Sequence, residues 1–189
     1  MKKLLATFIA CALTACGTDV PSKDGSLTSV TGERVTIDSK AMVESLNWTS
    51  KQMGILNSVE NSMGFPLSSA GKHLGERKQL LCDLANMSGA EVTRVTFITP
   101  LFFIPFPPFV TWEKGCKESG RSTLTVSEFC KEAKRIAGNS GDMRSRFYQA
   151  SRINGLTSRE QGNFTELFAY ENVSQNFFND AVKPLNCPN

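Results

Sequence analysis

Histidine is almost absent from this chain, which has one, His73, among 189 residues. A single imidazole excludes a metal site made of several histidines and argues against most histidine-based catalytic triads. The sequence also lacks a Walker loop and the GxGxxG, HExxH and GxSxG motifs, and its carboxylates are scattered rather than clustered. These absences favour a binding protein over an enzyme, and we expect no cofactor and no metal ion.

Charge of one sign is also scarce. The formal net charge is +3, and Lys2 and Lys3 contribute two of these charges, so the rest of the chain is nearly neutral. Nucleic-acid-binding domains carry a strongly basic face, and we therefore expect no nucleic-acid partner. The one basic concentration is typical of solvated helix faces, with contact to anionic lipid or peptidoglycan as the alternative. Its members are Lys131, Lys134, Arg135, Arg144, Arg146, Arg152 and Arg159.

The chain has no apolar run long enough to cross a bilayer as a helix, which takes about 20 residues. At the N-terminus, an apolar run over residues 4–13 follows Lys2 and Lys3 and ends in small residues. A basic start, a short apolar core and small residues at the end are typical of a secretory signal. We therefore expect the chain to be exported.

The end of this signal, Leu13-Thr14-Ala15-Cys16, resembles the lipobox of bacterial lipoproteins. The resemblance implies that the signal peptide, residues 1–15, is removed and that Cys16 carries two or more acyl chains, which hold a protein stably on a membrane. Gly17 follows where an aspartate would signal retention in the inner membrane, so the class implies the outer membrane, facing the periplasm. The polar residues after it make 16–32 a lipidated cysteine and flexible tether. An ordinary signal peptide with a chance cysteine is the alternative.

Six cysteines are present, of which Cys11 lies in the signal and Cys16 is the lipid acceptor. Four cysteines remaining in an exported chain indicate two disulfides, and a zinc site is disfavoured because the chain has no CxxC pair. Three pairings are possible. We favour the one in which a hairpin brings its second strand back to the helix before it and the C-terminus is fastened to a later helix. These pairs are Cys82–Cys116 and Cys130–Cys187.

Residues 33–189 are long enough for one core, and we expect a single α+β domain that is mainly helical. Apolar periodicity and capping boxes at Thr125–Glu128 and Thr157–Glu160 predict four or five helices. Two β-branched runs predict a hairpin of 92–99 with 109–116, and a short run near 33–39 is also β-prone. The helices are expected over about 40–63, 76–87, 126–137, 142–153 and 164–183.

The segment 99–112, TPLFFIPFPPFVTW, contains eight large apolar residues, four prolines and no charge. Prolines cannot donate to a β-ladder, so a regular central strand is excluded, although an irregular arch through the domain's own core is allowed. The alternatives are an exposed hairpin tip that dips into a membrane, or one that docks on a partner protein. The candidate contact residues are Leu101, Phe102, Phe103, Ile104, Phe106, Phe109 and Trp112.

Ser69 and Lys72 match the SxxK pattern of Ser-Lys acyl-transfer enzymes, in which the lysine takes the proton of the serine. The pattern is short, no KTG motif follows, and Gly71 weakens the helix that this geometry needs, so a polar loop is the competing interpretation. The sequence as a whole favours a membrane-anchored, non-enzymatic binding module at the cell envelope. A structural or assembly accessory of an envelope complex and a Ser-Lys hydrolase are the alternatives.

Overall fold

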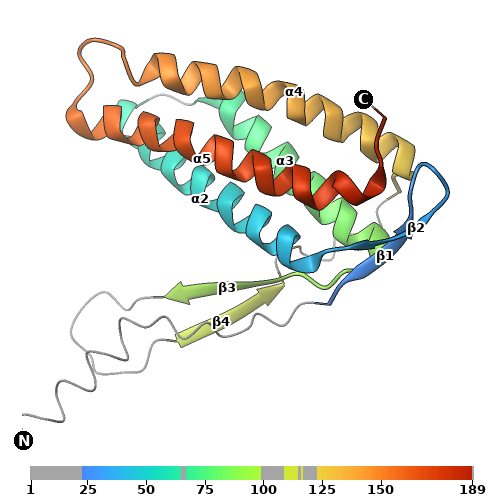
Figure 1. Cartoon of the computed structure of the whole chain (residues 1–189). Helices are drawn as coiled ribbons and strands as arrows, with labels where there is room; N and C mark the ends of the chain where they lie inside the picture. Colours follow the sequence, from blue (N-terminus) through green and yellow to red (C-terminus); the bar gives the residue numbers. More distant parts are fainter. Residues whose placement is uncertain (1–22, 65–66, 99–108, 115, 117–122, 189) are drawn as a thin grey trace, which may run out of the picture.

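A computed structural model of the chain describes residues 23–64, 67–98, 109–114, 116 and 123–188, with 93–98 and 109–114 as backbone alone. Over these residues the fold is a bundle of four long helices accompanied by two β-hairpins (Figure 1). Each helix packs against two others, in the cyclic order α2, α3, α4, α5, and successive helices run in opposite directions. The helices are α2 (Ser39–Met63), α3 (Ser68–Ser88), α4 (Val126–Ala150) and α5 (Ser158–Val182), and a short 3₁₀ turn, η1 (Lys183–Leu185), follows. The expected fold class, mainly helical α+β, is confirmed.

The helix ends follow the predicted capping signals. Asp38 accepts hydrogen bonds from the first backbone N–H groups of α2, and the helix ends at Gly64 in the left-handed conformation, with φ of 72°. Capping boxes at Thr125–Glu128 and Thr157–Glu160 begin α4 and α5, as the sequence predicts. Each box satisfies backbone N–H groups that the helix itself leaves unpaired.

Helix α4 is longer than predicted, because the two helices expected over 126–137 and 142–153 are one. Gly138 and Gly141 lie between them and were expected to break the helix, at a cost of about 1 kcal/mol each relative to alanine. The buried face nevertheless continues across the glycines, from Ile136 through Ser140 to Met143. Packing of this continuous face outweighs the low helix propensity of the glycines.

The first hairpin joins β1 (Gly25–Thr28) to β2 (Arg34–Ile37) and was predicted only in its second strand. Gly25 is buried against the end of α3, where a Cβ atom would lie 2.5 Å from Ser88 Oγ, so only glycine fits. Asp24 accepts hydrogen bonds from the backbone N–H and the hydroxyl of Ser39 at 2.9 and 2.7 Å. The prediction of a flexible tether is therefore wrong from Lys23 onward, and the domain begins before residue 33.

The second hairpin pairs β3 (Thr93–Ile98) with β4 (Phe109–Lys114) in antiparallel register, Thr93 opposite Lys114 and Ile98 opposite Phe109. This agrees with the predicted hairpin to within one or two residues at each end. The hairpin lies outside the four-helix bundle and leaves it near the C-terminal end of α3 (Figure 1). Among the described residues, no helix combines the length and apolar character needed to span a membrane.

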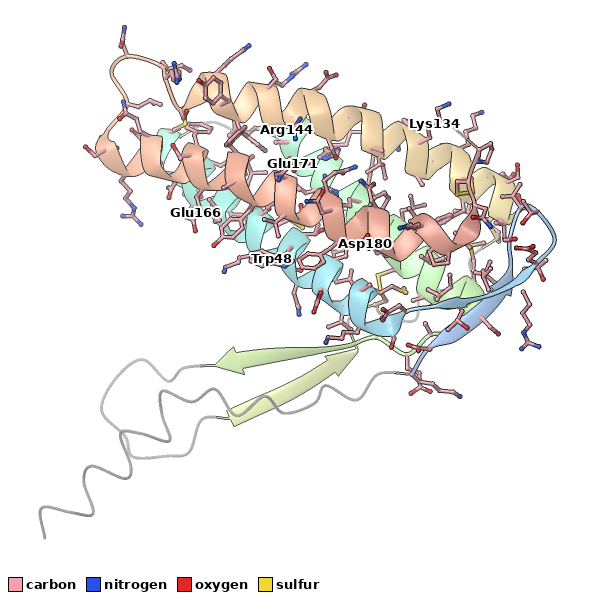
Figure 2. All side chains as sticks on the ribbon, in the orientation of Figure 1. Trp48, Lys134, Arg144, Glu166, Glu171 and Asp180 are labelled. Carbon is pink, nitrogen blue, oxygen red and sulfur yellow. A yellow bond between two sulfur atoms is a disulfide. The ribbon has the colours of Figure 1, made fainter. Side chains whose placement is uncertain are left out.

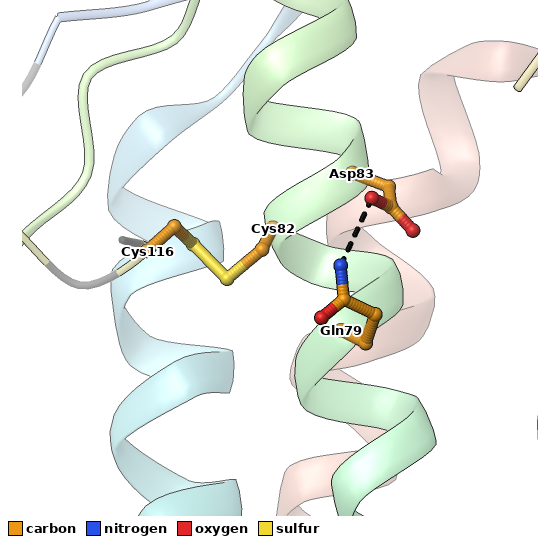
Figure 3. Close-up of a disulfide and its surroundings, with 4 residues drawn as sticks. All are labelled: Gln79, Cys82, Asp83 and Cys116. Atoms are coloured by element: carbon orange, nitrogen blue, oxygen red, sulfur yellow. Dashed lines mark hydrogen bonds between the residues drawn. A yellow bond between two sulfur atoms is a disulfide. The ribbon is translucent and has the colours of Figure 1, made fainter. Parts of the chain in front are cut away.

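Both predicted disulfides are confirmed. Cys82 of α3 bonds to Cys116, two residues after β4, beside the hydrogen bond from Gln79 to Asp83 on the same helix (Figure 3). Cys130 of α4 bonds to Cys187 beyond η1. One bond thus fastens the base of the second hairpin to the bundle, and the other fastens the C-terminus to α4.

Candidate functional site

The predicted contact segment lies mostly outside the described residues. These include Leu101, Phe102, Phe103, Ile104 and Phe106, as well as the lipidation site Cys16. Phe109 and Trp112 belong to β4, which is described as backbone alone. Contact of this segment with a membrane or a partner protein therefore stays a prediction.

The described residues bring together a second group, in the middle of the helical bundle. The apolar core forms two clusters, one around Leu46, Leu81 and Phe129 at the hairpin end and one around Leu56 and Phe164 at the other end. Polar side chains that are at most 3% exposed lie between the clusters and come from all four helices. We call this group the polar layer, and its hydrogen-bonded members are Gln52, His73, Arg77, Ser140, Glu171 and Ser174.

Arg77 is the centre of the polar layer. Its guanidinium forms an ion pair with Glu171 and donates hydrogen bonds to Ser140 Oγ at 2.5 Å and to Ser174 Oγ at 2.6 Å. Gln52 Nε2 donates to the second carboxylate oxygen of Glu171 at 2.8 Å. The charge pair is therefore enclosed by neutral hydrogen-bonding groups, which is the arrangement that a buried ion pair requires.

The surroundings of Glu171 favour its ionised form. Burial alone raises the pKa of this carboxyl, but contacts with His73 and the charge and hydrogen bonds of Arg77 outweigh burial and lower the pKa to about 2. Glu171 is thus a permanent anion above the acidic range. The Arg77–Glu171 pair carries no net charge in the core.

His73 joins the polar layer through one ring nitrogen. Its Nε2 lies 2.9 Å from Nη2 of Arg77 and 3.3 Å from both Ser140 Oγ and Glu171 Oε1. Its Nδ1 is buried and has no hydrogen-bond partner among the described residues. A Ser-His-acid triad needs the serine on one ring nitrogen and the acid on the other. Because both groups face Nε2, this arrangement is not a nucleophilic triad.

A hollow of about 220 Å³ lies between α3 and α4, and His73 is part of its lining. The rest of the lining mixes donors, both charges and one apolar side chain, and consists of Ser69, Lys72, Glu76, Arg135, Asn139, Asp142, Met143 and Arg146. A smaller hollow of about 150 Å³ between α4 and α5 reaches the other side of the polar layer at Ser140 and Glu171. The buried polar layer is thus approached from the surface on both sides of α4.

The SxxK residues lie in the first two turns of α3, not in the polar loop that competed with the enzyme interpretation. Ser69 is exposed, and the Lys72 side chain is 78% exposed and lies 3.9 Å from the Glu76 carboxylate. Lysines that act as bases are desolvated or adjoin another cation. Lys72 has neither feature, so this geometry gives no support to Ser-Lys hydrolysis.

Several of the basic residues on α4 have partners. Arg135 donates to Glu76 and Glu132, each at 2.8 Å, and these hydrogen bonds raise the pKa of its guanidinium. Arg144 donates to Asn172 on α5 at 3.0 Å. Lys134 and Arg144 lie on the exposed part of α4 (Figure 2). These positions agree with solvated helix faces more than with one continuous basic patch.

The sequence analysis missed the polar layer, although the sequence contains a signal for it. His73 and Arg77 are four residues apart on α3, in the same stripe as the buried residues Ala70, Leu81 and Leu84. Charged residues inside an apolar stripe are rare unless they are paired. Such interruptions predict buried polar groups, but they do not identify the partners on other helices.

Two further comparisons bear on the site. Within the described ranges, no three His, Cys, Asp or Glu side chains are grouped so that they could hold a metal ion. Comparison of the chain with models of known protein families, with curated proteins and with solved structures found no match.

Proposed function

We propose that the protein is a lipid-anchored bacterial lipoprotein whose helical domain acts as a non-enzymatic binding module at the cell envelope. The observation that carries this proposal is the N-terminal order of two lysines, a short apolar run and Leu13-Thr14-Ala15-Cys16. The two disulfides support export, because disulfides persist in oxidising compartments outside the cytoplasm. Gly17 favours the outer membrane, with the domain in the periplasm.

The connection between β3 and β4 is the surface that we propose for binding. It carries the apolar, proline-rich residues 99–108, and its hairpin is outside the bundle and fastened to α3 by Cys82–Cys116. A covalently fixed base lowers the entropy lost when a segment docks on another surface. Prolines lack an N–H group that lipid could not satisfy, so both a membrane and a partner protein suit this segment.

Replacing Cys16 tests the anchor. The Cys16→Ser variant is expected to accumulate as unprocessed precursor without lipid, because the thiol is the acceptor that processing requires. Intact-mass measurement of protein extracted from cell membranes checks both cleavage and acylation. Cys11→Ser is the matched control, since Cys11 lies inside the apolar run, and it should be processed and lipidated normally. A mature, lipidated Cys16→Ser protein would overturn the assignment.

Pull-down distinguishes a binding module from an assembly accessory. With the intact lipoprotein as bait, a module that contacts the membrane should recover no stoichiometric protein. A single envelope protein recovered at one-to-one stoichiometry would move the assignment to an accessory of that complex. Loss of this protein with Phe103→Asp and Phe106→Asp would place the contact on the segment 99–112.

A further inference from the structure

We propose that the hollow between α3 and α4 binds a small oxyanion, a carboxylate or a phosphate, one oxygen of which accepts a hydrogen bond from Nδ1 of His73. This site is separate from the segment 99–112 and does not depend on the anchor. It rests on three observations: the protonation of the His73 ring, the hydrogen-bond donors around the hollow, and the position of His73 between the hollow and the polar layer.

Arg77 determines which nitrogen of His73 carries the proton. A guanidinium can only donate hydrogen bonds, and Nη2 of Arg77 lies 2.9 Å from Nε2 of His73. A protonated Nε2 would place two donors face to face at that distance, so Nε2 is the acceptor. The proton of the neutral ring is then on Nδ1. Nδ1–H is a buried donor without an acceptor among the described residues.

A buried donor without a partner loses roughly 1–3 kcal/mol of hydrogen bonding relative to water. A ligand that brings an acceptor to this position recovers that loss. His73 is 3% exposed and lines the hollow, so a ligand there is the group from outside the protein that lies nearest to its ring. The missing partner is an oxygen acceptor rather than a donor or an apolar group.

The other groups around the hollow favour a negative acceptor. Lys72, Arg135 and Arg146 supply three cations, and Ser69 and Asn139 supply neutral donors. Of the two carboxylates, Glu76 is occupied by Arg135 at 2.8 Å and Lys72 at 3.9 Å. Asp142 is the second, and it lies four residues before Arg146 on α4. In the described part of the chain, no ion pair involves Arg146, so its guanidinium is available to an anion.

The size of the hollow limits the ligand. About 220 Å³ is below the roughly 300–1,000 Å³ of pockets for drug-sized molecules. A phosphate or a short carboxylate fits this volume, whether it is a free ion or the end group of a larger molecule. Binding would connect the ligand through His73 to the Arg77–Glu171 pair, and thus α3 to α5.

The single histidine makes the test direct, because every imidazole signal belongs to His73. The full-length chain, purified in detergent and with any affinity tag removed, is titrated with inorganic phosphate and, in a second arm, with acetate. Long-range ¹H–¹⁵N NMR spectra should show the Nδ1–H form of the free ring and a saturable shift of the Nδ1 resonance with either anion. Sodium chloride at equal ionic strength should give no saturable shift.

Variants of exposed residues locate the site without disturbing the core. Lys72→Gln with Arg146→Gln should weaken phosphate binding at least tenfold. Arg144→Gln removes the same charge from α4, but Arg144 lines the other hollow, so phosphate binding should be unchanged. An Nε2–H ring, the absence of a saturable shift with both anions, or equal weakening in the Arg144→Gln control would each overturn the proposal. Saturation by a phosphate-headgroup lipid in mixed micelles, without saturation by free phosphate or acetate, would overturn the small-ion assignment.

Discussion

The helical bundle and the β3–β4 hairpin are held in place in different ways. The bundle buries the inner faces of four helices against one another, in two apolar clusters and a polar layer. The hairpin pairs its two strands with each other, and the Cys82–Cys116 disulfide ties its base to α3. The difference indicates a scaffold that is stable through its own core and a hairpin that holds the segment 99–108 at one side. Substitutions in the two regions should therefore have different effects on stability.

Breaking the buried ion pair should have the largest effect. Arg77→Met leaves the Glu171 carboxylate buried without its counter-charge, and loss of one partner from such a pair costs about 3–5 kcal/mol. Urea unfolding followed by circular dichroism measures the change. Arg144→Met, on the exposed part of α4, is the matched control and should change stability by less than about 0.5 kcal/mol.

A double variant sharpens this result. Arg77→Met combined with Glu171→Leu removes both charges, so much of the lost stability should return. If Arg77→Met alone unfolds no more readily than the control, the polar layer is not the closed ion-pair network described above.

Loss of a disulfide should have the next largest effect. Replacing Cys130 and Cys187 by serine should destabilise the bundle by about 2–5 kcal/mol, because the bond closes a long loop between α4 and the C-terminus. Thermal unfolding under oxidising conditions measures this change. Replacing Cys82 and Cys116 should also expose the hairpin to limited proteolysis, since the bond fixes its base. Free thiols at these four positions in the native protein would contradict the assignment.

The Glu171 carboxylate predicts a pH dependence of the bundle. Its pKa is lowered to about 2 in the folded state, against an ordinary value of 4.5. The group therefore contributes stability that is fully present above about pH 4.5 and is lost as the pH falls from 4.5 towards 2. The free energy of unfolding, measured from pH 7 to pH 2 for the native chain and for Glu171→Gln, should differ in slope in this range. Parallel curves would show that Glu171 does not carry this contribution.

The sequence predicted well those features that depend on neighbouring residues. The capping boxes at Thr125 and Thr157 located the start of α4 and α5, because a cap depends on residues three positions apart. Apolar periodicity gave the start and end of α2 to within one residue. The disulfide pairing followed once the 92–116 region was interpreted as a hairpin, since the return of the second strand sets the level of Cys116.

The features that failed depend on contacts between distant segments. Gly138 and Gly141 stay helical because the buried face of α4 packs on other helices, which local propensity does not report. Gly25 belongs to the fold because the end of α3 passes within contact of it, 63 positions away at Ser88. The partners of Arg77 lie on α4 and α5, so the polar layer could be suspected from His73 and Arg77 but not assembled.

The smallest change in stability is expected at the connection between β3 and β4. Phe103→Asp with Phe106→Asp should alter the free energy of unfolding by no more than about 0.5 kcal/mol per site, if this segment is outside the core. Val30→Asp with Ile153→Asp is the matched control, because both residues are exposed apolar side chains. Flotation with phosphatidylethanolamine–phosphatidylglycerol liposomes then separates the membrane from a partner protein. Loss of flotation in the Phe103 and Phe106 variant alone favours the membrane.

The central claim is that this segment contacts something outside the domain, and the unfolding free energy of the Phe103→Asp, Phe106→Asp variant tests it most directly. The measurement uses residues 23–189, expressed under oxidising conditions, beside the native chain and the Val30, Ile153 control. We predict that all three unfold with free energies within about 1 kcal/mol of one another. A phenylalanine variant that loses several kcal/mol or fails to fold, while the control folds, would return the segment to the core of the domain and contradict the claim.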